Sequence, residues 1–189
     1  YEIGSGLVGS EMCIRDSPLA EVPNHAPASE PVSVASTPET DEIDQLFDDM
    51  QLDGIVSYTA FRQAVTGYQK IEQKSKSIMT LIDFSKPSTE KRLYVLDMKN
   101  KKLLYTSVVS HGKNSGGNYA TSFSNKNGSY KSSLGFYLTE NTYQGRNGYS
   151  LVLNGLEKGI NDQAKQRAIV MHGAASVSYT HLRAHETGA

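Results

Sequence analysis

Cysteine and tryptophan are the scarcest residues of this chain. Among its 189 residues there is one cysteine, Cys13, and no tryptophan. A single cysteine provides neither a disulfide framework nor a thiolate metal site. The net charge of −1 indicates no nucleic-acid or membrane-surface partner, and no run of about 18 apolar residues is present to span a membrane. What remains is the composition of one globular domain with a tail.

The two ends of the chain mirror one another at the level of codons. Read backwards, each residue of 4–16 has a codon that is the reverse complement of a codon for its partner in 177–189, from Asp16 with Val177 to Gly4 with Ala189. One DNA element present at both ends in opposite orientations explains this, and both segments resemble translated sequencing-adapter read-through. Such segments are left out of fold reasoning. We therefore interpret 1–17 and 176–189 as non-native and the native part as truncated at both ends.

The native part begins with a tail and a helical stretch. Residues 18–40 are rich in Pro, Ala, Ser and Glu, which predicts a disordered linker. Residues 41–76 carry apolar side chains at helical spacing, interrupted at Asp53-Gly54, and Ser57 is placed to cap the second of two short helices. We expect these helices to pack on the edge of the domain that follows.

Residues 77–175 have the pattern of a β-protein. The expected strands are 78–84, 92–98, 102–109, 135–139, 149–153 and 168–172, with a hairpin at 99–102. Long connections rich in Gly, Ser and Asn separate some of them, notably HGKNSGGNYATSFSNKNGSYKSS and NTYQGRNG. Loops of this length in a compact domain usually carry function. The predicted fold is mainly β with short N-terminal helices (α+β), a β-sandwich or barrel-like core.

Two histidine-glycine pairs are the candidate chemical groups. The run RAIVMHG delivers His172 and Gly173 to the end of a short apolar strand, where an imidazole can face a cleft and act as a general base. A histidine that merely ends a core strand explains the same pattern, and the residues alone leave both interpretations open. His111-Gly112 follows a second apolar strand, and a loop histidine bonded to backbone is its simpler explanation.

Other chemistries have less support in the sequence. No GxSxG motif accompanies the many serines, so a serine hydrolase that uses His172 is a weak alternative. The histidines and carboxylates show no metal-ligand spacing, and no cofactor is expected. The tyrosine-rich loops, with Tyr119 and Tyr143 among them, fit a carbohydrate or peptide surface, although half-buried packing is the commoner use of tyrosine in β-proteins.

A family resemblance covers most of the native part. The stretches VTGYQKI, IDFSKPSTEKRLYVLDMKNKKLLY, VVSHGKNSGGNYATSFSNKNGSYKSSLGFYLTENTYQG and LNGLEKGINDQAKQRAIVMHGA resemble the murein L,D-transpeptidase catalytic domain family, which has a YkuD-like fold. The resemblance implies a β-sandwich-like domain, export to the periplasm or cell envelope, and cysteine-dependent transfer of peptidoglycan stem peptides. On this basis 77–175 is a partial catalytic domain.

The resemblance also assigns a role to His172. In that family the histidine-glycine pair precedes a Ser-x-Gly-Cys segment that carries the nucleophile, so His172 is the implied general base. No such segment follows here, and Cys13 belongs to the mirrored segment, so we expect the chain to be inactive. Position alone suggests Gly173, His111, Tyr119 and Tyr143 as substrate-binding residues. A non-catalytic cell-wall-binding or structural module on the same fold is the alternative, and the oligomeric state is left open.

Overall fold

The described part of the chain folds into two helices and a set of strands, as the sequence predicted. The computed structural model describes residues 4–8, 38–146 and 148–173. The helices are α1 (Pro38–Asp49) and α2 (Tyr58–Lys70). The strands are β1 (Gly4–Val8), β2 (Ile78–Asp83), β3 (Leu93–Asp97), β4 (Lys102–Ser107), β5 (Gly135–Gly145), β6 (Gly148–Gly155) and β7 (Val170–His172). The fold is therefore mainly β with short N-terminal helices.

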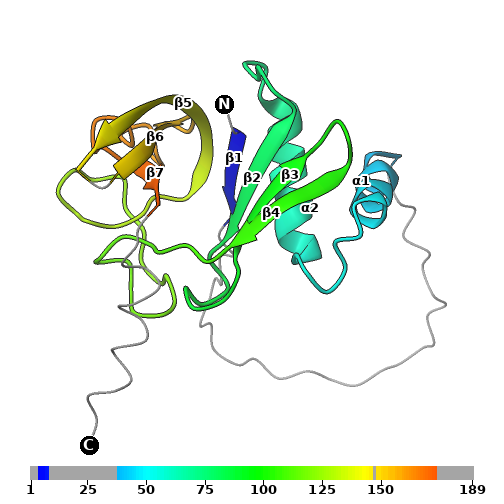
Figure 1. Cartoon of the computed structure of the whole chain (residues 1–189), viewed down its shortest axis with the longest axis horizontal. Coiled ribbons are helices and arrows are strands. Elements are labelled where there is room, and N and C mark those ends of the chain that lie inside the picture. Colours follow the sequence, from blue (N-terminus) through cyan, green and yellow to red (C-terminus); the bar gives the residue numbers. More distant parts are fainter. Residues whose placement is uncertain (1–3, 9–37, 147, 174–189) are drawn as a thin grey trace, which may run out of the picture.

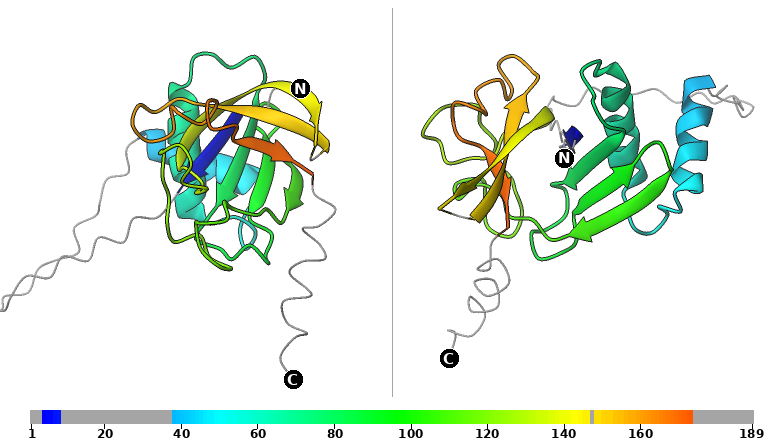
Figure 2. Two further views of the ribbon diagram at one scale, coloured as in Figure 1. Left: turned by 90° about the vertical axis from the view of Figure 1, so that its left-hand side faces the viewer. Right: turned by 45° about the horizontal axis from the view of Figure 1, so that its top comes forward.

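The described strands form one sheet that folds over on itself. Its order is β4-β3-β2-β1-β5-β6-β7, and every neighbouring pair is antiparallel except β1 and β2, which are parallel. The β5–β7 half lies across from the β2–β4 half, so the two halves resemble the layers of a sandwich (Figures 1 and 2). β1 joins the halves, since it pairs with both β2 and β5.

The helices form a layer of their own against one face of the sheet. Ser57 caps α2 as predicted, because its hydroxyl accepts a hydrogen bond from the Ala60 amide. The apolar side of α2, with Phe61 and Val65, packs with α1 over β2 and β3. Figure 2 shows both helices on the side of β2–β4 away from β5–β7. The expected packing on an edge was wrong, because two amphipathic helices bury more apolar area on a face than on an edge.

Two apolar cores flank β2 and β3. Met79 and Leu81 of β2 face the helices, whereas Ile82 and Phe84 face the β5–β7 half. The same alternation runs along β3. Strands that are buried on both faces read as continuous apolar runs, and this is how they appear in the sequence. β2 and β3 are thus the central layer of the molecule.

Several predicted boundaries shift. α1 begins at Pro38, inside the stretch assigned to the linker, since proline suits the first position of a helix. β5 and β6 pair as far as Gly145 and Gly148, so NTYQGRNG forms strand and a tight hairpin rather than a long connection. Residues 4–8 of the segment interpreted as non-native form β1. The rest of that segment, 9–17, as well as 18–37 and 176–189, lies outside the described residues.

Candidate functional site

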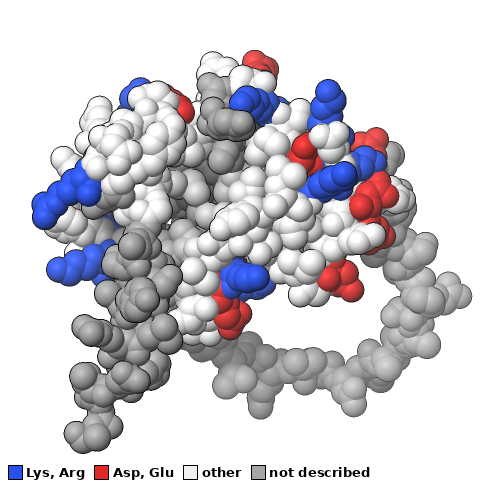
Figure 3. All heavy atoms as spheres, viewed as in Figure 1, with Lys and Arg blue, Asp and Glu red and all other residues white. Residues whose placement is uncertain are grey.

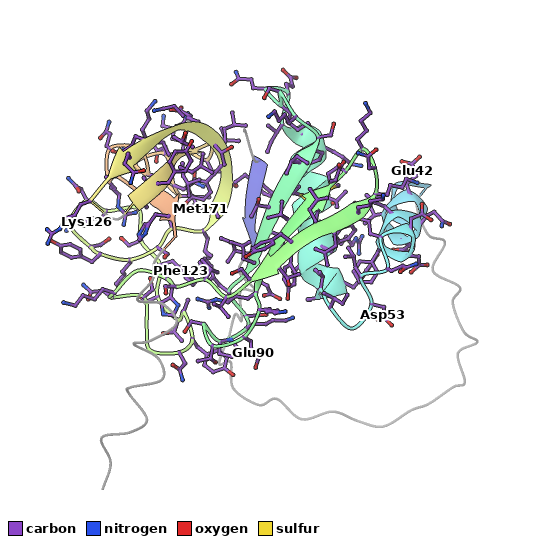
Figure 4. All side chains as sticks on the ribbon, in the orientation of Figure 1. Glu42, Asp53, Glu90, Phe123, Lys126 and Met171 are labelled. Atoms are coloured by element: carbon purple, nitrogen blue, oxygen red, sulfur yellow. The ribbon has the colours of Figure 1, made fainter. Side chains whose placement is uncertain are left out.

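A cavity of about 600 Å³ opens between the two halves of the sheet, on the second core. Apolar side chains of β2, β3, β6 and β7 form its walls, and no Asp, Glu, Lys or Arg lines it within the described part of the chain. Hydroxyls come from Ser107 at the end of β4, from Ser110 after it, and from Ser132 and Ser133 before β5. Figure 4 shows Met171 of the lining inside the curve of β5 and β6, whereas Lys126 points outward. The cavity suits an uncharged group held by hydroxyls at its edge.

His172 and Gly173 lie on this cavity, at the end of the edge strand β7. The Nδ1 atom of His172 is 3.2 Å from the carbonyl oxygen of Gly173. Since a carbonyl only accepts, this contact requires the hydrogen on Nδ1 and leaves the Nε2 lone pair available. The imidazole is exposed, so Nε2 is accessible to a reacting group. This is the geometry that a general base needs.

No serine serves as a partner for His172 in the described residues. Ser150 lies directly opposite His172 in the β6–β7 ladder, but its hydroxyl donates to the carbonyl of Gly148 at 3.2 Å. The hydroxyls of Ser132 and Ser133 on the cavity wall likewise bond to other groups of the described residues and not to the imidazole. The arrangement gives a serine hydrolase no support.

His111 lies behind the cavity wall and is held by Arg92. An Nη2 hydrogen of Arg92 is directed at Nδ1 of His111, with 2.9 Å between the nitrogens, and Nε2 of His111 is 3.3 Å from the carbonyl oxygen of Gly116. Because a guanidinium only donates, Nδ1 must accept, and Nε2 must carry the hydrogen. His111 is therefore fixed as one neutral tautomer. Val109 and Ser110, its chain neighbours, line the cavity, but His111 itself does not.

Arg92 is completely buried, which is rare for an arginine. It donates from Nε and Nη2 to the carbonyl of Val109, at 3.0 and 2.7 Å, and from Nη1 to the carbonyl of Lys86 at 2.9 Å. Burial lowers the pKa of Arg92 to about 10, although the negative charge of Asp83 raises this pKa and so offsets part of the effect. Arg92 thus ties the loop before β3 to the loop that follows β4.

The two predicted tyrosines lie away from the cavity. Tyr119, in the long loop, is 54% exposed, and Tyr143, on β5, is 43% exposed. Tyr143 faces Ser150 across the ladder, and Ser150 faces His172, so the three positions form one row across β5, β6 and β7. Of the predicted site residues, the structure brings His172 and Gly173 together on the cavity and leaves His111, Tyr119 and Tyr143 outside its lining.

Charge does not mark the site. In the view of Figure 3, acidic and basic side chains lie side by side over α1 and the neighbouring β3–β4 turn, while the middle of this face is uncharged. No group of three or more His, Cys, Asp or Glu residues that could hold a metal ion occurs in the described ranges. The described part also contains no helix with the length and apolar character needed to cross a bilayer. Shape and hydroxyls, rather than charge, distinguish the cavity.

Comparison with known families decides the relationship. The family described as the L,D-transpeptidase catalytic domain matches residues 53–188, well over half of the chain. The chain belongs to this family. The matched range contains α2, β2–β7 and the strand-end His172, and it extends over 176–188, which the codon pairing had set apart as non-native. Searches of curated proteins and of solved structures find no significant match.

Sequence reasoning missed the residues that organise the site. Arg92 begins the run RLYVLDM and Arg167 begins RAIVMHG, and a charged residue directly before an apolar run is the only signal that either leaves. Arg167 donates to four oxygens of the loop at 124–133. These partners are 34 to 43 positions away in the sequence, so local patterns could not reveal them.

Proposed function

We propose that this chain is part of a peptidoglycan L,D-transpeptidase in which His172 is the general base. The observation that carries the proposal is the place of His172: it ends the edge strand β7 on an uncharged cavity, with Nε2 free to take a proton. Family membership supports acyl transfer as the reaction. The substrates are stem peptides of the cell wall, which fits an exported protein of the cell envelope.

The proposed reaction has two acyl-transfer steps. A cysteine thiol gives its proton to Nε2 of His172, and the thiolate attacks a peptide carbonyl of the donor stem. The carbon–nitrogen bond breaks, the leaving amine takes the proton from the imidazolium, and a thioester remains. The acceptor amine then attacks the thioester, and the thiol is released with its proton restored. No cofactor is required for this sequence.

The nucleophile is the missing part of this proposal. The only cysteine is Cys13, in the segment interpreted as non-native, and no Ser-x-Gly-Cys segment occurs in the sequence. We therefore propose that this chain alone is inactive. Incubation with a carbapenem-type β-lactam, followed by intact-mass measurement, should show no adduct on the chain or on its Cys13→Ser variant. A stable adduct that survives Cys13→Ser would contradict the missing nucleophile.

The genomic DNA downstream of the codon for Ala175 provides the positive arm of the test. A chain extended by that sequence should contain a cysteine and form the adduct, and His172→Gln should slow adduct formation by roughly a hundredfold or more. Tyr149→Phe, an exposed change on β6, is the matched control and should leave the rate unchanged. An extended sequence without a cysteine would instead select a non-catalytic cell-wall-binding or structural module.

A further inference from the structure

Arg167 lies in the turn that leads into β7 and is bonded to a distant loop. Its Nη1 donates to the Ser124 carbonyl and to the Ser133 hydroxyl, both at 2.6 Å. Its Nη2 donates to the Ser129 hydroxyl at 3.1 Å and to the Lys131 carbonyl at 2.5 Å. One guanidinium therefore gathers four neutral oxygens from a single stretch of the long loop. A planar fork of donors can do this, whereas the ammonium of lysine cannot reach in the same geometry.

The stretch that Arg167 holds is a wall of the cavity. Ser132 and Ser133 line the same cavity as His172. The amide of Ser132 donates to the Ser115 hydroxyl at 2.8 Å, and its hydroxyl accepts from the Gly112 amide at 2.9 Å. These two hydrogen bonds tie the earlier part of the loop, at 112–115, to the part at 124–133 that Arg167 holds. Arg167 thus connects both parts of the loop to the strand that carries His172.

Tyr137 completes this connection from the inner face of β5. Its hydroxyl donates to the carbonyl of Ser133 at 2.9 Å, and its ring lines the cavity. Ser133 is buried and is held on both sides, at its hydroxyl by Arg167 and at its carbonyl by Tyr137. Tyr137 therefore ties Ser133 to β5, and Arg167 ties it to the turn that leads into β7.

We propose that Arg167 is a positioning residue, which sets the place of the Ser132–Ser133 wall relative to His172 and so fixes the surroundings of the imidazole. The proposal rests on the proposed role of His172, because it takes the four hydrogen bonds of Arg167 to serve the placement of that base. Its physical content is independent of catalysis: removal of the guanidinium should release the loop and change the environment of His172 while the folded core persists.

Nuclear magnetic resonance of the full chain tests this inference. In Arg167→Gln we expect the amides of Ser124 and Ser132 to exchange with solvent about tenfold faster, since charge-assisted hydrogen bonds that hold the loop are lost. The imidazole resonances of His172 should shift in the folded protein. Arg167→Lys should restore neither fully, because it keeps the charge but loses the fork. Arg62→Gln, an exposed change on α2, is the matched control and should alter neither signal.

Two results would overturn the inference. One is an unchanged His172 resonance in a folded Arg167→Gln protein; the other is faster exchange in β2 and β3 that equals the change in the loop, which would make Arg167 a general stabiliser. If Arg167→Gln does not fold, Ser129→Ala removes one of the four hydrogen bonds of Arg167. The same amide exchange rates and His172 resonances are then measured in that variant. These measurements need no acylation, so they stand apart from the outcome of the β-lactam test.

Discussion

Arg92 illustrates how much of this site depends on single buried side chains. Arg92→Leu removes the guanidinium that donates to the carbonyls of Lys86 and Val109 and to Nδ1 of His111. Buried acceptors that lose their partner are costly, so we expect the free energy of unfolding to fall by about 3 kcal/mol. Urea denaturation measures it. The exposed change Arg62→Leu should stay within about 0.5 kcal/mol of the parent, and an equal loss in both variants would contradict the argument.

Tyr137 gives the site a pH dependence at the alkaline end. Burial raises the pKa of Tyr137 to about 12, although its hydrogen bonds oppose the shift. The folded state thus favours the neutral phenol, and this stability is complete below about pH 10 and is lost as the pH rises towards 12. The loss amounts to about 3 kcal/mol over that interval.

Denaturation at a series of alkaline pH values measures this prediction for Tyr137. In Tyr137→Phe the decline between about pH 10 and pH 12 should become shallower, because the phenol that titrates late is gone. Tyr149→Phe, which removes a hydroxyl from a side chain that is 68% exposed, should keep the parent profile. The same profile in all three proteins would show that another group causes the decline.

Single residues also show where sequence reasoning ends. His172 could be singled out because strand-end position and the following glycine are local features. The tautomers of His111 and His172 could not, because they depend on Arg92, Gly116 and a carbonyl whose positions only the fold determines. Arg92 and Arg167 escaped for the same reason, since their partners lie far along the chain.

At the scale of elements, the apolar strands were the easiest to predict. β2, β3 and β4 fall within the expected ranges because they are short apolar or alternating runs between polar turns. The outer part of β5 was missed: Thr142, Tyr143 and Gln144 lie in the stretch expected to be a loop, yet they pair with β6 in the ladder. Backbone hydrogen bonds extend this hairpin past the last buried side chains, and apolar periodicity reports burial rather than pairing.

The long loop holds its shape because two of its parts touch through a glycine. A Cβ on Gly112 would lie 2.6 Å from the carbonyl oxygen of Tyr130 and 2.7 Å from the amide nitrogen of Ser132. Both are backbone atoms that cannot turn aside. We expect Gly112→Ala to lower the free energy of unfolding by about 2 kcal/mol and to speed exchange of the Ser132 amide.

Gly117 supplies the control within the same loop. A Cβ there meets nothing within 4 Å, so Gly117→Ala should leave stability unchanged or raise it by about 0.5 kcal/mol. Urea denaturation of both alanine variants separates a close backbone approach from a general need for glycine in the loop. Equal destabilisation of the two would remove the proposed contact as the cause.

At the scale of the whole molecule, the described residues form two cores that share β2 and β3. The first core, under α1 and α2, is filled by side chains that are almost completely buried. The second contains the cavity of about 600 Å³ beside His172. Fewer apolar side chains are buried in the second core than in the first, so the β5–β7 half gains less from packing. Its backbone link to the rest of the sheet is β1, which pairs with β2 and β5.

This arrangement predicts what removal of residues 1–17 does. In a chain that begins at residue 18, β5 loses its pairing with β1 and keeps its pairing with β6. Side-chain contacts in the second core then link the β5–β7 half to β2. Hydrogen exchange should become faster in β5 and β6, while β3, which pairs with β2 and β4 and belongs to the first core, keeps its protection. Equal loss in both halves would show that the cores unfold as one unit. Unchanged exchange throughout would show that β1 adds nothing to the stability of the sheet. That result would agree with the interpretation of residues 1–17 as a segment foreign to the domain.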